Sequence, residues 1–246
     1  MDMFMEGYGN IKVLGDGVIP DGIYNNIKIA GSCNIVGSIS ANLLKISGSC
    51  NCNENIKSEE IKVYGSFNNK GEVFCNNLFV VNGAASILKG NFKGLVKVRG
   101  ELSVKEDSSF ENIEVYGELK ALGNFEGNAF HGYGRVDIEG LLSADKVEII
   151  IHDNSEIKEI GGENISIKNN TSKKFFERLF NQTKKGYVRC NLIEGDNIYL
   201  ENTICDIIRG ENIIIGKGCT IGTIEYSNNL TIDKESMVRN EVCTKN

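Results

Sequence analysis

The chain has 246 residues, of which 28 are glycine and one is proline, and 41% are hydrophobic. That hydrophobic fraction can form a buried core, which excludes an intrinsically disordered chain. The net charge of −6 gives the molecule as a whole no electrostatic attraction for nucleic acid, so we expect no nucleic-acid partner.

Residues 1–10, MDMFMEGYGN, are expected to form an N-terminal tail. They lack the basic segment and apolar run of a secretion signal, and no later segment approaches the roughly 18 consecutive apolar residues of a membrane span. We therefore expect a cytoplasmic protein. In that reducing compartment the eight cysteines are predicted to be free thiols that fill the core, because no pair of Cys-x-x-Cys motifs indicates a metal site.

From residue 11 a five-residue motif recurs, in which an apolar, a polar and a second apolar residue are followed by any residue and then glycine. Its copies are IKVLG at 11, IKIAG at 27, LKISG at 44, IKVYG at 61, VKVRG at 96, IEVYG at 113 and VDIEG at 136, with FVVNG at 79 as a variant. The closing glycines are Gly15, Gly31, Gly48, Gly65, Gly83, Gly100, Gly117 and Gly140. All intervals but the last lie between 16 and 18 residues, so the sequence has a repeat of about 17 residues.

Each motif alternates with the two-residue period of a strand that has one buried face, so Ile27 and Ile29 are predicted to point inward and Lys28 outward. A second alternating run follows each glycine, and a third precedes the next motif. The second run predicts two further interior columns: Cys33, Cys50, Phe67, Ala85, Leu102, Leu119, Leu142, and Ile35, Cys52, Ile87, Val104, Ala121, Ala144. Three short strands per repeat predict an all-β triangular parallel β-helix of roughly 12 coils, stacked about 4.8 Å apart.

Glycine and asparagine are predicted to form the corners, since both tolerate unusual backbone dihedrals and stacked asparagine amides can bond along the ladder. The pattern continues with ISIKN at 165, IYLEN at 198, IIIGK at 213 and LTIDK at 230. We therefore predict a solenoid over 11–170 and its continuation over 187–246. The register between Gly117 and Ile165 has more than one solution at this point.

The segment 171–186, TSKKFFERLFNQTKKG, breaks the alternation and predicts a short amphipathic helix inserted into the solenoid. Its apolar face is Phe175, Phe176, Leu179 and Phe180, and its basic residues include Lys173, Lys174 and Arg178. Three surfaces could bury that aromatic face: the flank of the solenoid, another subunit, or an anionic membrane. The last alternative would place the protein peripherally at the inner face of the cell membrane.

The sequence gives little support for catalysis. Its two histidines, His131 and His152, could act as general bases, but no nucleophile motif, phosphate-binding loop or His-Glu-x-x-His metal motif accompanies them. The segment IGKGCTIG at 215–222 resembles one hexapeptide of the left-handed β-helix acyltransferases, without the six-residue repeat. A carbohydrate-active β-helix would need a cluster of carboxylates on one outward face. We predict no catalytic residues, no metal ligands and no cofactor.

The outward position of the motif forms a basic column in the N-terminal coils: Lys12, Lys28, Lys45, Lys62 and Lys97. Like charges stacked at the spacing of adjacent strands repel one another unless acidic neighbours or an anionic partner offset them. The column is therefore either a solvated face or a docking stripe for an acidic surface.

The segment 26–66, NIKIAGSCNIVGSISANLLKISGSCNCNENIKSEEIKVYGS, resembles the bactofilins, a family of bacterial polymer-forming cytoskeletal proteins, and the likeness extends more loosely over 11–168. The resemblance implies a right-handed triangular β-helix that assembles end to end into nonpolar, nucleotide-independent filaments. It also implies association with membranes and with cell-envelope or motility proteins. The chain departs from the family pattern in that its repeats fill nearly its whole length and an insertion interrupts them.

The ends of a solenoid expose unpaired strand edges and apolar columns, which need either a cap or another copy. Ile11 and Val13 at one end, and Leu230 and Ile232 at the other, are the candidate polymer interface. We therefore expect a non-catalytic, bactofilin-like scaffold whose partner is itself. The alternatives are a monomeric β-helix adaptor, a hexapeptide-type acyltransferase and a carbohydrate-active enzyme.

Overall fold

The computed structural model describes residues 9–170 and 186–244. These ranges consist of β-strands joined by turns and bends, and they contain no helix. The strands form about 13 parallel turns roughly 17 residues apart, which confirms the predicted parallel β-helix and is close to the expected number of coils. The chain divides into two compact units, 1–113 and 114–246, which we describe separately.

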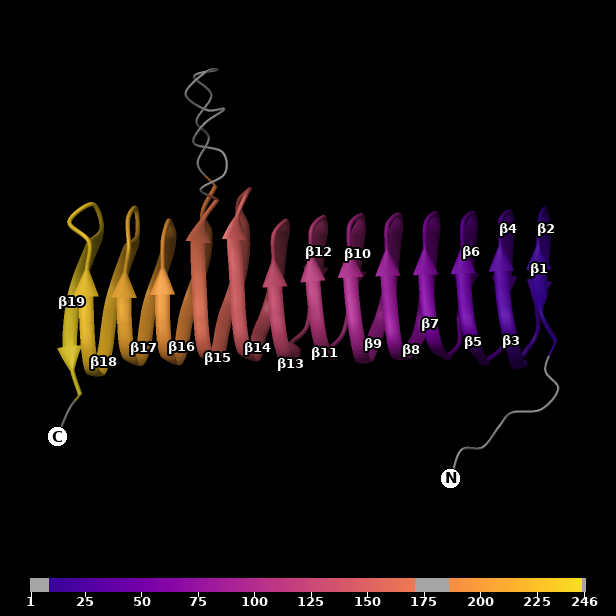
Figure 1. Cartoon of the computed structure of the whole chain (residues 1–246), viewed down its shortest axis with the longest axis horizontal. Helices are drawn as coiled ribbons and strands as arrows, with labels where there is room; N and C mark the ends of the chain where they lie inside the picture. Colours follow the sequence, from indigo (N-terminus) through magenta and orange to yellow (C-terminus); the bar gives the residue numbers. More distant parts are fainter. Residues whose placement is uncertain (1–8, 171–185, 245–246) are drawn as a thin grey trace, which may run out of the picture. The chain divides into compact units, whose positions relative to one another are not determined.

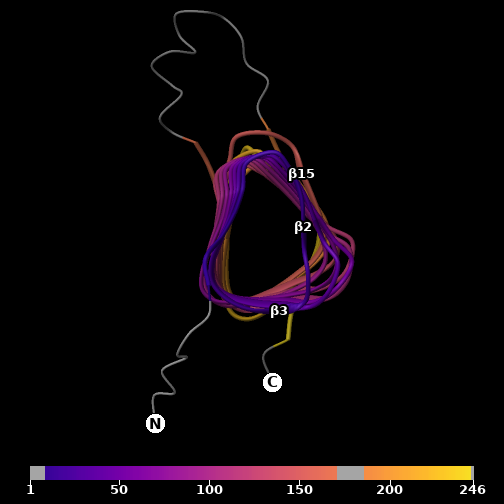
Figure 2. The same cartoon turned by 90° about the vertical axis from the view of Figure 1, so that its right-hand side faces the viewer.

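In the first unit every strand pairs in parallel with the strand at the same place in the next coil (Figure 1). Ile11 lies beside Ile27, for example, and Ile27 lies beside Leu44. Seen along the stack, each coil has a rounded triangular outline (Figure 2). The strands are β1 (Ile11–Val13), β2 (Asp16–Ile19), β3 (Gly22–Ile29), β4 (Ser32–Ile35), β5 (Ile39–Ile46), β6 (Ser49–Cys52), β7 (Ile56–Val63), β8 (Ser66–Val81), β9 (Ala84–Val98), β10 (Glu101–Val104) and β11 (Ser108–Val115), which contains the unit boundary.

The second unit repeats this plan, and its strands between residues 135 and 232 are as continuous as β8 and β9 of the first unit. After Gly186 the chain resumes in register, since Ser155 of one coil pairs with Val188 of the next and Ile167 pairs with Leu200. The predicted helix at 171–186 lies, apart from Gly186, outside the described residues. The strands are β12 (Glu118–Ala121), β13 (Phe125–Gly132), β14 (Arg135–Ile151), β15 (Ser155–Asn169), β16 (Val188–Leu200), β17 (Thr203–Ile215), β18 (Thr220–Ile232) and β19 (Met237–Cys243).

Up to Gly117 the interior columns are those that the alternation predicts. Ile27 and Ile29 are at most 1% exposed, whereas Lys28 between them is exposed. Every residue predicted for the two columns after the glycine is buried as well, but the last member of each column was wrong. Leu142 and Ala144 pair with Phe125 and Gly127, so they belong to the third strand of their coil. One coil fills its place in the second column with a polar residue, Asn69, whose side-chain amide donates to the Glu54 carbonyl oxygen at 2.8 Å. The core is therefore continuous and almost wholly apolar within each unit.

Glycine is required at the motif corners for a different reason from the one predicted. None of the motif glycines has a positive φ; among the described glycines only Gly22 and Gly218 do. Instead, a Cβ at Gly31, Gly48 or Gly65 would lie 2.0–2.1 Å from the carbonyl oxygen of the stacked glycine one coil earlier. The corners pack too closely for any side chain, so close approach of the backbones requires glycine there.

The motif at 136 is misplaced in the sequence alignment. Val136 and Ile138 pair with Leu119 and Ala121, so they belong to the second strand of their coil. The stacked glycine after Gly117 is Gly134, not Gly140, because a Cβ at Gly134 would lie 1.9 Å from the Gly117 carbonyl oxygen. The first-strand column of the second unit instead contains Phe130, Val147 and Ile165, which pair in that order.

Asparagine side chains bond along the stack, as predicted, in both units. In the second unit Asn197 donates to Asn164, and Asn212 donates to Asn197, both at 3.1 Å. In the first unit Asn26 donates to Asn10 at 2.9 Å. Each amide bonds a neighbouring coil, so these ladders stabilise the corner where the first strand begins.

Candidate functional site

The outer edge of β1 belongs to the first coil of the first unit. Ile11 and Val13 are only partly buried there, although Ile27 and Ile29, their partners in the next coil, are fully buried. The difference arises because β3 covers one side of β1 and the described chain places no coil on the other. Main-chain groups and two apolar columns therefore reach the surface at this edge.

The last coil of the second unit has a comparable edge. β19 pairs only with the first half of β18, from Thr220 to Tyr226. Leu230 and Ile232, in the second half of β18, therefore have no partner in β19. These two side chains remain partly exposed, whereas their partners Ile213 and Ile215 are 1% exposed. The structure thus places all four predicted interface residues at open column ends, two in each unit.

Sequence reasoning missed a polar residue that ends one of the columns. Ile193, Ile208 and Ile224 are fully buried partners in successive coils, and the next residue in this register is Glu241 of β19. A carboxylate that ends an apolar column discourages further stacking, because burying the charge costs free energy. Comparing 230–243 with the first coil could have shown it, since Gly22 is the corresponding residue there.

The lysine column lies along the outside of the first unit, in direct register from Lys12 through Lys28 and Lys45 to Lys62. Val80 interrupts it before Lys97. Neighbouring groups offset part of the charge: the Lys62 ammonium contacts the Glu60 carboxylate at 2.5 Å, and the Lys45 ammonium lies 5.0 Å from the centre of the Tyr64 ring. The first lysines of the column, Lys12 and Lys28, are the most solvent-exposed.

Two partly buried histidines lie in the second unit. Nδ1 of His131 is 3.4 Å from a carboxylate oxygen of Glu148, its partner in the next coil. The Asn170 side-chain nitrogen lies 3.1 and 3.2 Å from the two ring nitrogens of His152. Neither histidine lines the groove around Asp137 and Glu156 or the groove around Gly195 and Gly210.

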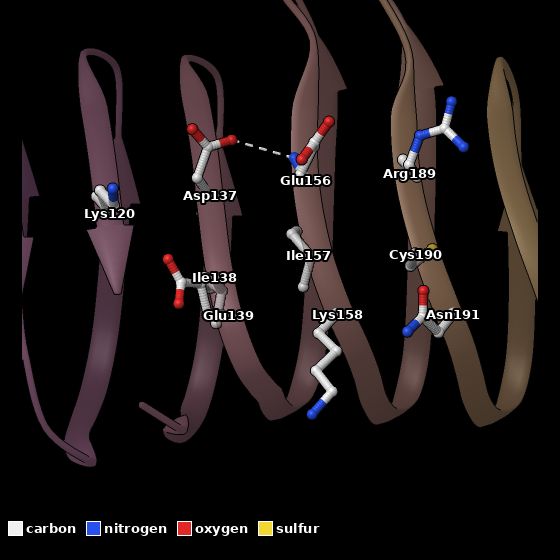
Figure 3. A pocket seen from close by; sticks show the side chains of 10 residues that line it. All are labelled: Lys120, Asp137, Ile138, Glu139, Glu156, Ile157, Lys158, Arg189, Cys190 and Asn191. Carbon is white, nitrogen blue, oxygen red and sulfur yellow. Dashed lines mark hydrogen bonds between the residues drawn. The ribbon is translucent and has the colours of Figure 1, made fainter. Parts of the chain in front are cut away.

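One of these grooves, of about 320 Å³, crosses the outer face of four coils (Figure 3). One row of its side chains runs from Lys120 through Asp137 and Glu156 to Arg189. Charges of both signs line it, with Asp137 and Glu156 side by side between the two basic residues. Asp137 is already bonded, since it accepts from Arg135 at 2.7 and 2.8 Å. The groove is shallow and polar, unlike the apolar pockets that bind most small molecules.

Seven of the eight cysteines are buried, and Cys243 is exposed. Desolvation raises the pKa of the buried thiols Cys33, Cys50 and Cys52, and it raises the pKa of Cys75 to about 11. Such thiols stay protonated at neutral pH and act as small apolar residues. Over 9–170 and 186–244, no group of three or more His, Cys, Asp or Glu side chains is arranged to hold a metal ion.

The candidate membrane or partner contact falls outside the described residues, since it comprises Lys173, Lys174, Phe175, Phe176, Arg178, Leu179 and Phe180. Described residues on either side of it form hydrogen bonds at this corner. The main-chain N–H of Asn169 donates to the Glu201 carboxylate at 2.8 Å, and the Asn202 side chain donates to the Gly186 carbonyl oxygen at 3.4 Å. Within the described ranges, no helix is long and apolar enough to cross a membrane.

Comparison with known proteins finds two relatives in Bacillus subtilis strain 168. The chain is 43% identical to the uncharacterized protein YhbF over 101 residues. This alignment covers 41% of the chain and 40% of YhbF. The chain is 38% identical to the uncharacterized protein YhbE over 109 residues, and that alignment covers 44% of each protein. The chain thus spans less than half the length of either relative. No family model and no solved structure matches.

Proposed function

We propose that this chain is a non-catalytic structural scaffold that self-assembles through the ends of its β-solenoid, in the manner of a bactofilin and without nucleotide. The observation that carries the proposal is the partial exposure of Ile11, Val13, Leu230 and Ile232 at open strand edges. Their neighbours in the same columns are fully buried.

Association has a clear driving force. Full burial of a large aliphatic side chain contributes about 1.5–3 kcal/mol, so completing the burial of four half-buried side chains contributes several kcal/mol. The open edges of β1 and β18 can also gain main-chain hydrogen bonds. The Glu241 carboxylate opposes this gain where it ends its column, which favours reversible assembly.

Self-assembly is tested with two charged substitutions in the interface, Ile11→Glu and Leu230→Glu. We expect wild-type protein to form elongated particles in negative-stain electron microscopy, and both variants to sediment as monomers with an unchanged β circular-dichroism spectrum. The matched controls are Lys12→Glu and Thr231→Glu, which place the same charge in the same strands on outward side chains. Wild-type protein that stays monomeric at high concentration would contradict the proposal.

A third variant tests the opposing role of Glu241. Glu241→Leu replaces a charge with an apolar side chain at the end of the Ile193–Ile208–Ile224 column. We expect the protein concentration needed for assembly to fall by about tenfold, because the charge no longer has to be desolvated. An unchanged or higher concentration would show that Glu241 does not limit assembly.

A monomeric adaptor is the second candidate function, and the lysine column favours it. An acidic partner docked on Lys12, Lys28 and Lys45 would be released by salt, because its attraction is screened over about 8 Å at physiological ionic strength. Capture of such a partner by the wild-type protein, but not by Lys28→Glu, would support an adaptor if the protein is monomeric.

Peripheral membrane association is a further proposal, based on the amphipathic sequence at 171–186. Aromatic side chains at the headgroup boundary and basic residues near anionic lipid give binding that depends on lipid charge. Co-sedimentation with anionic liposomes should weaken with salt and be lost when Phe176 and Phe180 are both replaced by glutamate. Equal binding by the double variant would contradict it.

A further inference from the structure

The first and last described coils expose apolar side chains on their outer faces. Val18 is 64% exposed and Ile23 is 38% exposed, and both lie on the outside of the first coil. Their partners in the next coil are polar, Asn34 and Ser40. At these two outward positions the first coil therefore has apolar side chains where the second coil has polar ones.

The last coil shows the same feature. Met237 is 64% exposed and Val242 is 45% exposed, and both belong to β19. Their partners one coil earlier are Thr220 and Glu225. Interior coils also expose single apolar side chains, such as Val36 at 62% and Ile214 at 46%, so only the positions at which the apolar residues of the two end coils coincide are informative.

The two end coils share a pattern of apolar positions. Residues 11–24, IKVLGDGVIPDGIY, align without a gap with residues 230–243, LTIDKESMVRNEVC. Apolar residues coincide at five positions, and the pairs are Ile11 and Leu230, Val13 and Ile232, Val18 and Met237, Ile19 and Val238, and Ile23 and Val242. Two of these pairs are the outward ones. The end coils are therefore the same structural repeat in the same register.

Building on the proposed self-assembly, we propose that the contact is head to tail, with the first coil of one copy stacked on the last coil of the next. In this arrangement Ile11 and Val13 continue the columns that end at Leu230 and Ile232. Val18 then covers Met237, and Ile23 covers Val242. The contact repeats the parallel pairing of every coil within the two units, whereas a head-to-head contact would bring edges together in antiparallel orientation.

Two glycines of the first coil fit this arrangement. No described atom lies within 4 Å of a Cβ built at Gly15, although the equivalent Cβ at Gly31 would collide with the Gly15 carbonyl oxygen. A coil from another copy would bring the same close approach to Gly15. Gly22, which has no side chain, corresponds to Glu241 and would leave room for that carboxylate.

A head-to-tail contact is heterologous, since it joins two different surfaces, and such contacts continue into open polymers. The resulting filament has two different ends. It differs in this respect from the nonpolar filaments that the resemblance to bactofilins implies.

Cysteine cross-linking tests the polarity. In a Cys243→Ser background, Val18→Cys and Met237→Cys are placed in two chains that carry tags of different size. Both replaced side chains are mostly exposed, so neither change should disturb folding. Stacked strands lie about 4.8 Å apart, within the Cα separation that a disulfide can bridge. The remaining cysteines are buried.

The two variants are mixed under assembly conditions and mildly oxidised. We expect mixed-size dimers to exceed either same-variant dimer by about tenfold, because only unlike ends meet. Same-variant dimers as the main product would overturn the head-to-tail contact while leaving self-assembly intact. Assembled particles without mixed dimers would also overturn it. Chains that remain monomeric without oxidant would instead contradict the proposed function.

Discussion

The two units share their interior but differ in their corners and outer faces. Both fill their columns with isoleucine, valine, leucine and phenylalanine. The first unit stacks glycines after the first strand of each coil, from Gly15 to Gly100, whereas the later coils of the second unit stack Gly162, Gly195 and Gly210 at the corner before it. The same fold therefore tolerates two corner solutions, and the interior alternation specifies the architecture.

The outward columns differ even more. The motif position that holds Lys12, Lys28, Lys45 and Lys62 in the first unit holds His131, Glu148, Ser166 and Tyr199 in the second. Because these residues point away from the core, the fold places no constraint on their charge. A partner can therefore distinguish the two units through these outward columns.

The largest expected effect is the difference in reaction rate between buried and exposed thiols. Buried cysteines occur in both units, so the same experiment compares the units. Cys50 and Cys205 should react with iodoacetamide about 1,000-fold more slowly than exposed Cys243, since burial keeps their sulfur atoms from solvent and a coil must open first. Mass spectrometry locates the modified residues over time. Different rates in the two units would show that they open separately, and rapid native labelling of Cys50 would contradict the closed core.

Corner glycines give the next largest effect. Gly48→Ala should lower the free energy of unfolding by about 3 kcal/mol, because its Cβ would lie 2.1 Å from the Gly31 carbonyl oxygen. Urea denaturation of the non-assembling Leu230→Glu protein measures the change. Gly15→Ala occupies the same corner with open space around it and should change stability by less than about 0.5 kcal/mol. Equal effects would refute the close-approach explanation.

The asparagine ladder of the second unit should contribute a smaller amount. Asn212 donates to Asn197 and accepts from Asn228 and Asn229, so Asn212→Ala removes three side-chain hydrogen bonds. We expect a loss of about 1–2 kcal/mol, because each partly exposed bond contributes little. Asn51→Ala in the first unit, an exposed asparagine on a strand, is the control and should be nearly neutral.

Removing single cations should give the smallest effects, with opposite signs in the two units. Lys28→Gln relieves repulsion from Lys12 and Lys45 and should stabilise the protein by at most about 0.5 kcal/mol. Arg135→Gln removes the exposed pair with Asp137 and should destabilise it by a similar amount. Both effects should shrink in high salt, and a salt-independent change would show that charge is not its cause.

The interior of the fold was predictable from the sequence because alternation reports burial directly, as Ile27, Lys28 and Ile29 illustrate. The register after Gly117 was harder to predict, since first and second strands alternate in the same way. Val136, Asp137 and Ile138 imitate the first-strand motif but belong to the second strand. Counting one more period from Gly117 reaches Gly134, the glycine that stacks.

The cause of the corner glycines could not be inferred from one chain. Close approach of Gly31 to Gly15 depends on the direction in which the Gly15 carbonyl oxygen points, which the pattern of residues does not contain. The four candidate interface residues were predictable, because the first and last motifs must lie at column ends. Glu241 could be found only by aligning 230–243 with the first coil, and its place at the end of an apolar column is established once β19 is paired with β18.

The corner between β15 and β16 has a consequence for engineering. These strands pair directly, Ile167 with Leu200, although 171–185 separates them in the chain. The entropy cost of closing a loop rises by only about 0.6 kcal/mol for each doubling of its length, so this corner should accept foreign segments without a shift in register. If copies stack as proposed, a peptide grafted here would be displayed once per subunit, and the filament would become a regularly spaced one-dimensional array of ligands.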